Sequence, residues 1–302
     1  MVRYFKFALV FLYILLTILC LLLVLILSGI HITGLTGWLI VAGWTLYCFS
    51  SAWLFTGLNL YFSQVRLPIR SEEERLTSAF TTVSKNAGPH RPIRLRVIES
   101  DEWEAFAIGV RTIAISKAML RDLSPNELEG VMAHELGHII SYDTIIASAY
   151  VQARFLTYGI TIVFRWIAGI LTFGFRKQSR PRLSHGIIWL VLAAILLYYL
   201  RFLPLTLFVL TFAILNRLFR LFDLLLSRLT EYRQDAFAHS LGFGKDLRDV
   251  LEKLAQQREQ PVSPYFIAFH GTHPIIYNRI RRLEQLEDTG DQRRTLNTNP
   301  TP

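Results

Sequence analysis

The stretch His134-Glu135-Leu136-Gly137-His138 decides how the rest of this 302-residue chain is interpreted. On a helix, residues four apart project from nearly the same face, so both imidazoles can bind one metal ion. Glu135 then lies beside the open position of the metal, where its carboxylate can take a proton from an attacking water. The pattern predicts a hydrolytic zinc site. The alternative is a chance match on a surface helix.

The sequence also marks the start of the helix that carries this motif. Ser124 is a good N-cap, Pro125 suits the first helical position, and Glu127 completes a capping box. Apolar residues then follow one stripe while the first turn stays polar, which is typical of an amphipathic helix in a water-soluble domain. This argues against a zinc motif held inside a membrane span.

Apolar residues are concentrated in four blocks of the chain, which is 52% hydrophobic and 18% charged. The first two blocks, 7–30 and 37–62, carry no charge and are each long enough to cross ~30 Å of hydrocarbon. They run into one another through a turn, so we interpret them as an anchoring hairpin and not as a cleavable signal peptide. Blocks 145–175 and 186–215 contain arginines, which we expect to face a helix bundle or a water-accessible cleft. For Arg165 the alternative is a side chain that snorkels from near a helix end.

Basic flanks predict the orientation of the chain. Arg3 and Lys6 precede the first block, Arg66 and Arg70 follow the second, and the turn between has no Lys or Arg. The zinc motif is therefore expected on the cytoplasmic side of the cell (inner) membrane. The basic connector 176–182 conflicts with this, so the second pair is either a partly re-entrant hairpin or a spanning hairpin whose topology the first hairpin fixed.

Charge and cysteine content exclude two other classes of partner and site. Cys20 and Cys48 both lie in predicted spans, so they form neither a disulfide framework nor a zinc set. The net charge of +9 is dispersed and gathers at membrane flanks, without a basic patch interleaved with aromatic residues. An anionic lipid bilayer is the expected partner, and nucleic acid is not.

A small sheet is predicted ahead of the zinc helix. Ile93, Leu95 and Val97 alternate with charged residues, and short strands follow at 106–110 and 112–116. Zinc peptidases commonly lay an extended substrate against an exposed edge strand, because backbone hydrogen bonds hold it without demanding a sequence. The sequence leaves open which strand is the edge. Packing against the zinc helix is the alternative role for most of these side chains.

The third metal ligand is expected after the second apolar pair, and Glu231 is the candidate. Asp235 lies four residues later on the same helix face, a like-charge pair that a cation and an imidazole between them would stabilise. The plausible division assigns Glu231 to zinc and Asp235 to the far nitrogen of a ligand histidine. The alternative is a solvated helix face, with Arg228 and Arg233 as partners of the two carboxylates.

Three ordered motifs together resemble a known family: the His-Glu-Leu-Gly-His stretch, Glu231-Tyr-Arg-Gln-Asp235, and Thr272-His273-Pro274 followed by Arg279-Ile280. They are similar to the membrane-anchored gluzincins that contain the heat-shock protease HtpX and the CAAX prenyl endopeptidases, with size and hairpins matching the HtpX branch. The resemblance extends to about Leu286.

The resemblance implies a role for each residue of the site. It implies zinc on His134, His138 and Glu231, with Glu135 as general base and His273 as a donor to the oxyanion. From the residues alone, a histidine beside Pro274 is more often a turn residue. The resemblance also implies a substrate-pairing strand at Ala105, Phe106 and Ala107. This chain departs from the family just before that strand, where Glu104 replaces the usual Asn.

The sequence thus predicts an α-helical membrane protein with an α+β zincin-like (gluzincin) catalytic domain and about four transmembrane or membrane-embedded helices in two hairpins. We expect an integral membrane zinc endopeptidase with one zinc ion per chain. The resemblance adds misfolded or damaged membrane proteins as substrates and a stress-response role. A site-specific processing peptidase and a catalytically inactive scaffold are the alternatives.

The expected segments are a transmembrane hairpin (1–64), a first catalytic segment (65–144), a second membrane hairpin (145–215), a second catalytic segment (216–287) and a disordered tail (288–302).

Overall fold

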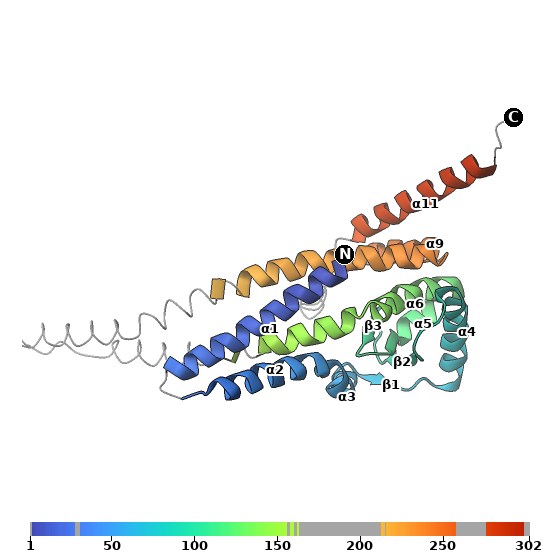
Figure 1. Cartoon of the computed structure of the whole chain (residues 1–302). Coiled ribbons are helices and arrows are strands. Elements are labelled where there is room, and N and C mark those ends of the chain that lie inside the picture. The colour runs from blue at the N-terminus through green and yellow to red at the C-terminus, as the bar shows by residue number, and fades with distance from the viewer. Residues whose placement is uncertain are drawn as a thin grey trace, which may run out of the picture. The chain divides into compact units, whose positions relative to one another are not determined.

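The computed structural model is mostly helical, with one small sheet, and describes residues 2–27, 31–155, 216–257 and 276–298 together with a few isolated positions. The chain, whose elements are labelled in Figure 1, divides into two compact units. One unit comprises Met1–Ala8, Phe49–Ala149 and Asp223–Pro302, and the other comprises Leu9–Cys48 and Tyr150–Phe222.

Two helices near the N-terminus have the length and composition of membrane spans. They are α1 (Val2–Leu27) and α2 (Gly34–Leu54), whose apolar windows are Arg3–Leu23 and Gly34–Leu54. The hairpin expected from the sequence is therefore present as a helix pair, although the predicted second block is interrupted at Phe55 before the short α3 (Thr56–Phe62). Of the predicted second hairpin, residues 143–155 are helical, and nearly all of the rest lies outside the described residues.

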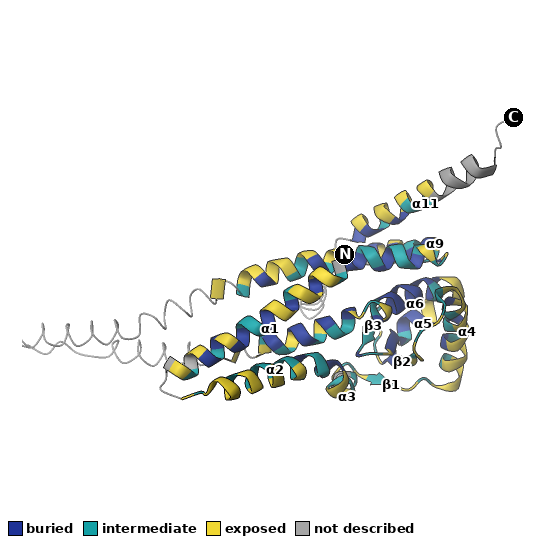
Figure 2. Ribbon diagram, viewed as in Figure 1, coloured by how far each residue is buried: buried dark blue, intermediate teal, exposed yellow. Residues whose placement is uncertain are grey.

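The unit that contains most of α1 and α2 has polar contacts inside and apolar side chains outside. The buried Tyr13 hydroxyl donates to Asn216 Oδ1 at 2.7 Å, and its ring packs against Tyr150 and Phe219. Large apolar side chains are exposed on the helices, such as Trp38, which is 74% exposed (Figure 2). A soluble domain rarely exposes so many large apolar side chains, so this pattern is typical of lipid-facing helices.

The other unit contains a four-stranded sheet in the order β1-β2-β4-β3. Its strands are β1 (Val65–Arg66), β2 (Arg94–Ile98), β3 (Ala105–Ile108) and β4 (Thr112–Ser116). β2 and β4 are parallel, while β1 and β3 are antiparallel to their neighbours. The three longer strands lie where alternation and turn residues predict them, and β3 is an edge strand.

Helices α4 (Arg70–Ala87) and α6 (Pro125–Ile140) pack on this sheet and on each other, with the short α5 (Lys117–Asp122) between β4 and α6. α6 begins as the sequence predicts, because Ser124 Oγ accepts from the Glu127 amide while the Glu127 carboxylate accepts from the Ser124 amide. Eleven of the 16 residues of α6 are buried, and most of the helix is dark blue in Figure 2. The zinc-motif helix is thus the centre of the core and not a surface helix.

The last two helices that the structure describes in this unit are α9 (Gly244–Gln257), which packs on α6, and α11 (Ile276–Thr298), which packs on α9. The approach of α9 requires a glycine on α6, since a Cβ at Gly130 would lie 2.6 Å from the Leu247 amide nitrogen. α11 continues to Thr298, into the segment for which composition predicts disorder. Good helix formers such as Gln292, Arg293 and Leu296 account for this difference.

Candidate metal centre

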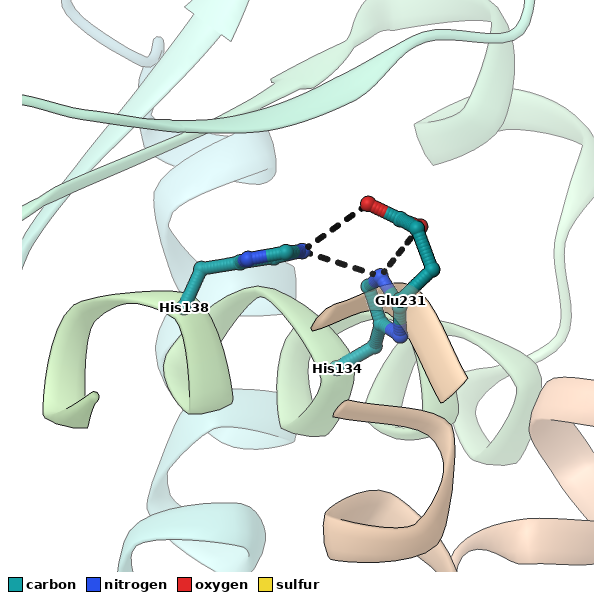
Figure 3. Close-up of side chains that lie close together, drawn as sticks. All are labelled: His134, His138 and Glu231. Atoms are coloured by element: carbon teal, nitrogen blue, oxygen red, sulfur yellow. Dashed lines mark hydrogen bonds and ion pairs between the residues drawn. The ribbon is translucent and has the colours of Figure 1, made fainter. Parts of the chain in front are cut away.

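The two motif histidines meet over one face of α6. Because they are one turn apart, their side chains project together, and the Nε2 atoms of His134 and His138 lie 3.3 Å apart. Figure 3 shows both rings directed toward a carboxylate from a separate helix. His134 is only 5% exposed. The site is therefore built on the rigid core of the unit.

Glu231 supplies that carboxylate from the helix of residues 216–240. Its Oε2 lies 3.5 Å from His134 Nε2 and its Oε1 lies 3.5 Å from His138 Nε2. One ligand atom from each residue falls within 4.8 Å of the others (Figure 3). Tetrahedral ligands at the usual zinc distances are about 3.3 Å apart, and two imidazoles with one carboxylate form a known catalytic zinc set. The donor set therefore fits a zinc ion in both spacing and chemistry.

The electrostatics of the two imidazoles favour positive charge between them. Burial lowers the pKa of His138, but hydrogen bonds to Asp143 and Glu231 outweigh it and raise the pKa to about 10. Burial and the charge of Arg279 likewise lower the pKa of His134, yet its bonds to Asp235 and Glu231 leave that pKa above its ordinary value. Metal ligands must be neutral imidazoles. A bound cation would therefore take the place of these protons.

Asp235 backs His134, as the spacing on the helix predicts. Its Oδ1 lies 2.9 Å from His134 Nδ1, the nitrogen that faces away from Glu231. Arg279, from α11, holds the same carboxylate in a fork, with Nη2 2.6 Å from Oδ1 and Nε 2.9 Å from Oδ2. Burial raises the pKa of Asp235, but Arg279 and His134 outweigh it and lower the pKa to about 2. Asp235 is therefore a fixed anion beneath the first imidazole.

Arg279 also joins the two acidic residues of this helix. Its Nη1 lies 3.3 Å from Glu231 Oε2, so one guanidinium spans both carboxylates. Burial lowers the pKa of Arg279, but the charges of Asp235 and Glu231 outweigh it and keep the group protonated. The predicted like-charge pair is thus stabilised by a cation from a distant helix, which the sequence signals only as a member of the third motif.

Asp143 backs the second histidine, and reasoning from the sequence missed it. Its Oδ2 lies 3.4 Å from His138 Nδ1. It also accepts hydrogen bonds from Ser141 Oγ at 2.9 Å, Gln234 Nε2 at 2.7 Å and Arg233 Nη2 at 2.8 Å. Burial raises the pKa of Asp143, but the bond to His138 and nearby positive charges lower it below its usual value. The sequence offered one signal for this role of Asp143, because it is an acidic residue just after the motif helix and just before an apolar block.

Gly137, inside the motif, permits the second helix to come this close. A Cβ there would collide with the Gln234 side-chain amide and lie 2.9 Å from the Phe237 ring. Gln234 is fully buried and donates to both Ser141 and Asp143. The glycine of the motif therefore serves the packing that brings Asp143 under His138.

Glu135, predicted as the base, is 8% exposed on α6, and its charge raises the pKa of both His138 and Arg279. It therefore lies in the same electrostatic environment as the histidines. His273, predicted as an oxyanion donor, lies outside the described residues.

The predicted substrate strand, Ala105 to Ala107, lies in β3, which contacts α6 and pairs only with β4 among the described strands. The turn after β3 is fixed by Thr144, whose Oγ1 donates to the Gly109 carbonyl at 2.5 Å. The edge strand and the candidate metal centre thus share one rigid frame.

Comparison with known proteins finds sequence matches that span most of the chain. The model of the family described as "Peptidase family M48" matches residues 70–287, which contain the whole cluster. A protease HtpX homolog of Dictyoglomus turgidum is 28% identical over 249 residues, covering 75% of this chain and 74% of that protein. Protease HtpX of Salmonella arizonae is 27% identical over 290 residues, covering 88% of this chain and 92% of that protein.

Two further matches have a similar extent along this chain. A protease HtpX homolog of Thermococcus sibiricus is 27% identical over 301 residues, covering 86% of this chain and 95% of that protein. The crystal structure of S. mikatae Ste24p is 19% identical with a TM-score of 0.47, and the match covers 82% of this chain but 57% of the Ste24p chain.

Proposed function

The chain belongs to peptidase family M48, and on this premise we propose that it is a membrane-anchored zinc endopeptidase. The observation that carries the proposal is the cluster of His134, His138 and Glu231, in which each imidazole has a buried carboxylate at its far nitrogen. Carboxylate-backed histidines are the usual construction of protein zinc sites. The function is hydrolysis of peptide bonds in polypeptide substrates.

His134, His138 and Glu231 would hold one zinc ion per chain. The ion supplies Lewis acidity toward a peptide carbonyl and toward water. Asp235 and Asp143 fix which ring nitrogen carries the proton, since each accepts at Nδ1 and leaves Nε2 free to bind. Arg279 holds Asp235 and Glu231 in place and compensates their charge.

Glu135 is the proposed general base. Its carboxylate takes the proton of the attacking water and returns it to the amide nitrogen of the leaving product. Its charge acts on His138 and Arg279, which supports a position beside the histidines. We assign His273 the role of hydrogen-bond donor to the oxyanion of the scissile carbonyl, following the family motif.

β3 is proposed to pair with the substrate. It is the last strand of the sheet among the described residues, so its outer side can offer backbone donors and acceptors to an extended peptide. Glu104, directly before the strand, is half-buried, and burial together with Glu102 raises its pKa. Because the family usually has Asn there, this position is where we expect the substrate preference of this chain to differ.

The proposed cellular setting is the cell (inner) membrane, with α1 and α2 as spans and the metal centre facing the cytoplasm. The basic residues Arg3, Lys6, Arg66 and Arg70 flank this hairpin and support the orientation. Misfolded or damaged membrane proteins are the proposed substrates, because an unfolded chain can supply the extended segment that β3 would bind.

The test is Glu135→Gln in the full-length protein. Zinc content should stay at one ion per chain, while cleavage of an unfolded model protein should fall about 10²–10⁴-fold, since the ligands remain and the proton acceptor is lost. Glu129→Gln, on the same helix, is the matched control and should keep its activity. Cleavage by Glu135→Gln at the wild-type rate would contradict the assignment. Zinc-free wild-type protein would instead favour a catalytically inactive scaffold.

A further inference from the structure

Tyr142 adopts a backbone conformation that tyrosine rarely takes. It follows the end of α6 with φ of 62°, a left-handed position that normally holds glycine and that a side chain disfavours. Its ring is 43% exposed. Backbone strain of this kind is found mostly at functional sites. The groups around the Tyr142 ring therefore indicate what the ring could do.

Two guanidinium groups flank the Tyr142 ring. Arg3 lies 6.0 Å and Arg91 5.9 Å from its centroid, although the two residues are far apart in the chain. Within the described part of the chain, neither forms an ion pair with a carboxylate, and the only side-chain bond of Arg3 is to the hydroxyl of its neighbour Tyr4. The exposed tyrosine therefore lies in a positively charged site without a protein counter-ion among the described residues.

A cavity of about 360 Å³ adjoins this site. Arg3, Tyr4 and Tyr142 form part of its lining. The other lining residues are apolar and come from α1, α2 and the helix after Tyr142; they are Phe7, Phe49, Ile145 and Ile146. The cavity is thus amphipathic, with apolar walls and a cationic edge.

We propose that this cavity binds one anionic phospholipid, whose phosphate contacts Arg3 and Arg91 and whose acyl chain lies along the apolar walls. α1 is a candidate membrane span that begins at Arg3 itself, so the cationic edge lies where lipid headgroups meet hydrocarbon. A free phosphate ion would gain nothing from the apolar walls. General attraction to an anionic bilayer needs no such cavity, and a lipid bound here takes no part in the peptidase reaction.

Binding can be counted directly on the full-length protein in detergent. Native mass spectrometry during titration with phosphatidylglycerol should show one tightly retained lipid per chain, and phosphatidylcholine should bind more weakly. In the double variant Arg3→Gln/Arg91→Gln the retained phosphatidylglycerol should bind about 30-fold more weakly, since each basic residue near an anionic lipid contributes about fivefold.

The matched control is Arg70→Gln/Lys85→Gln, which removes the same charge from exposed positions on α4 and should leave binding unchanged. Equal weakening in both double variants, equal binding of the two lipids to the wild type, or displacement of the lipid by excess inorganic phosphate would each overturn the proposal. Tyr142→Gly gives an independent check, because glycine suits the positive φ and the variant should fold. It should lose the preference for phosphatidylglycerol, and a retained preference would count against the site.

Discussion

The two histidines of the metal centre have the same chemistry but different supports. His134 rests on Asp235 at 2.9 Å, and Asp235 is 1% exposed and locked by the Arg279 fork. His138 rests on Asp143 at the longer distance of 3.4 Å. The first support is a buried ion pair between residues distant in sequence from His134. The second is a carboxylate close to His138 in sequence, which also accepts hydrogen bonds from Ser141 and Gln234.

This difference indicates how much each imidazole depends on one contact. Removing Asp235 takes away the two short bonds that hold the buried Arg279 and leaves it only the longer contact with Glu231, and breaking a buried pair in this way is costly. Removing Asp143 leaves Ser141 and Gln234 still bonded to each other, with Ser141 Oγ accepting from Gln234 Nε2 at 2.8 Å. We therefore expect the His134 side to be the more sensitive half of the site.

The largest effect should come from the one residue that the two sides share. Glu231→Ala removes a direct ligand and also the carboxylate that faces both Nε2 atoms. The purified protein should contain almost no zinc and should be inactive, as measured by metal analysis and by cleavage of an unfolded protein. Glu284→Ala, an exposed position on α11, is the control. A zinc-replete Glu231→Ala protein would show that the third ligand lies elsewhere.

Much of the His134 side could be predicted from sequence because its signals are local. The four-residue spacings of His134 with His138 and of Glu231 with Asp235 place both pairs on helix faces, and the capping box at Ser124 sets the start of α6. Periodicity and caps act within a few residues. The edge position of β3 was not predictable, because strand order depends on long-range pairing.

The supports of the site were harder to predict because they depend on tertiary packing. Arg279 reaches Asp235 from a helix 44 residues further along the chain. Asp143 reaches His138 across the break between two helices at Tyr142, whose positive φ is not a property that a tyrosine signals. His273 and most of the second hairpin lie outside the described residues, so they stay predictions.

The second effect should come from Asp235→Asn, which keeps the shape of the side chain but removes its charge. Zinc affinity should fall by about 100-fold, the upper end for a residue that orients a ligand. Competition with a chromophoric chelator measures this, and zinc in excess should restore slow turnover. If Asp235→Asn empties the site while Glu231→Ala does not, the aspartate is the ligand and the assigned helix register is wrong.

The smallest effect should come from Asp143→Asn, the matching change on the other side. The amide oxygen can still accept from His138 Nδ1, and Ser141 and Gln234 remain to position it. Zinc affinity should fall by about 10-fold, the lower end for an orienting residue. The same chelator competition compares the two asparagine variants, and thermal unfolding of the metal-free proteins shows whether both stay folded. Equal losses of affinity in two folded variants would mean that Asp143 constrains its imidazole as strongly as Asp235 does. In that case the distances of 2.9 and 3.4 Å would not reflect a difference in how strongly the two histidines are held. The two sides would then differ in which residues support the histidine, but not in the effect on zinc affinity.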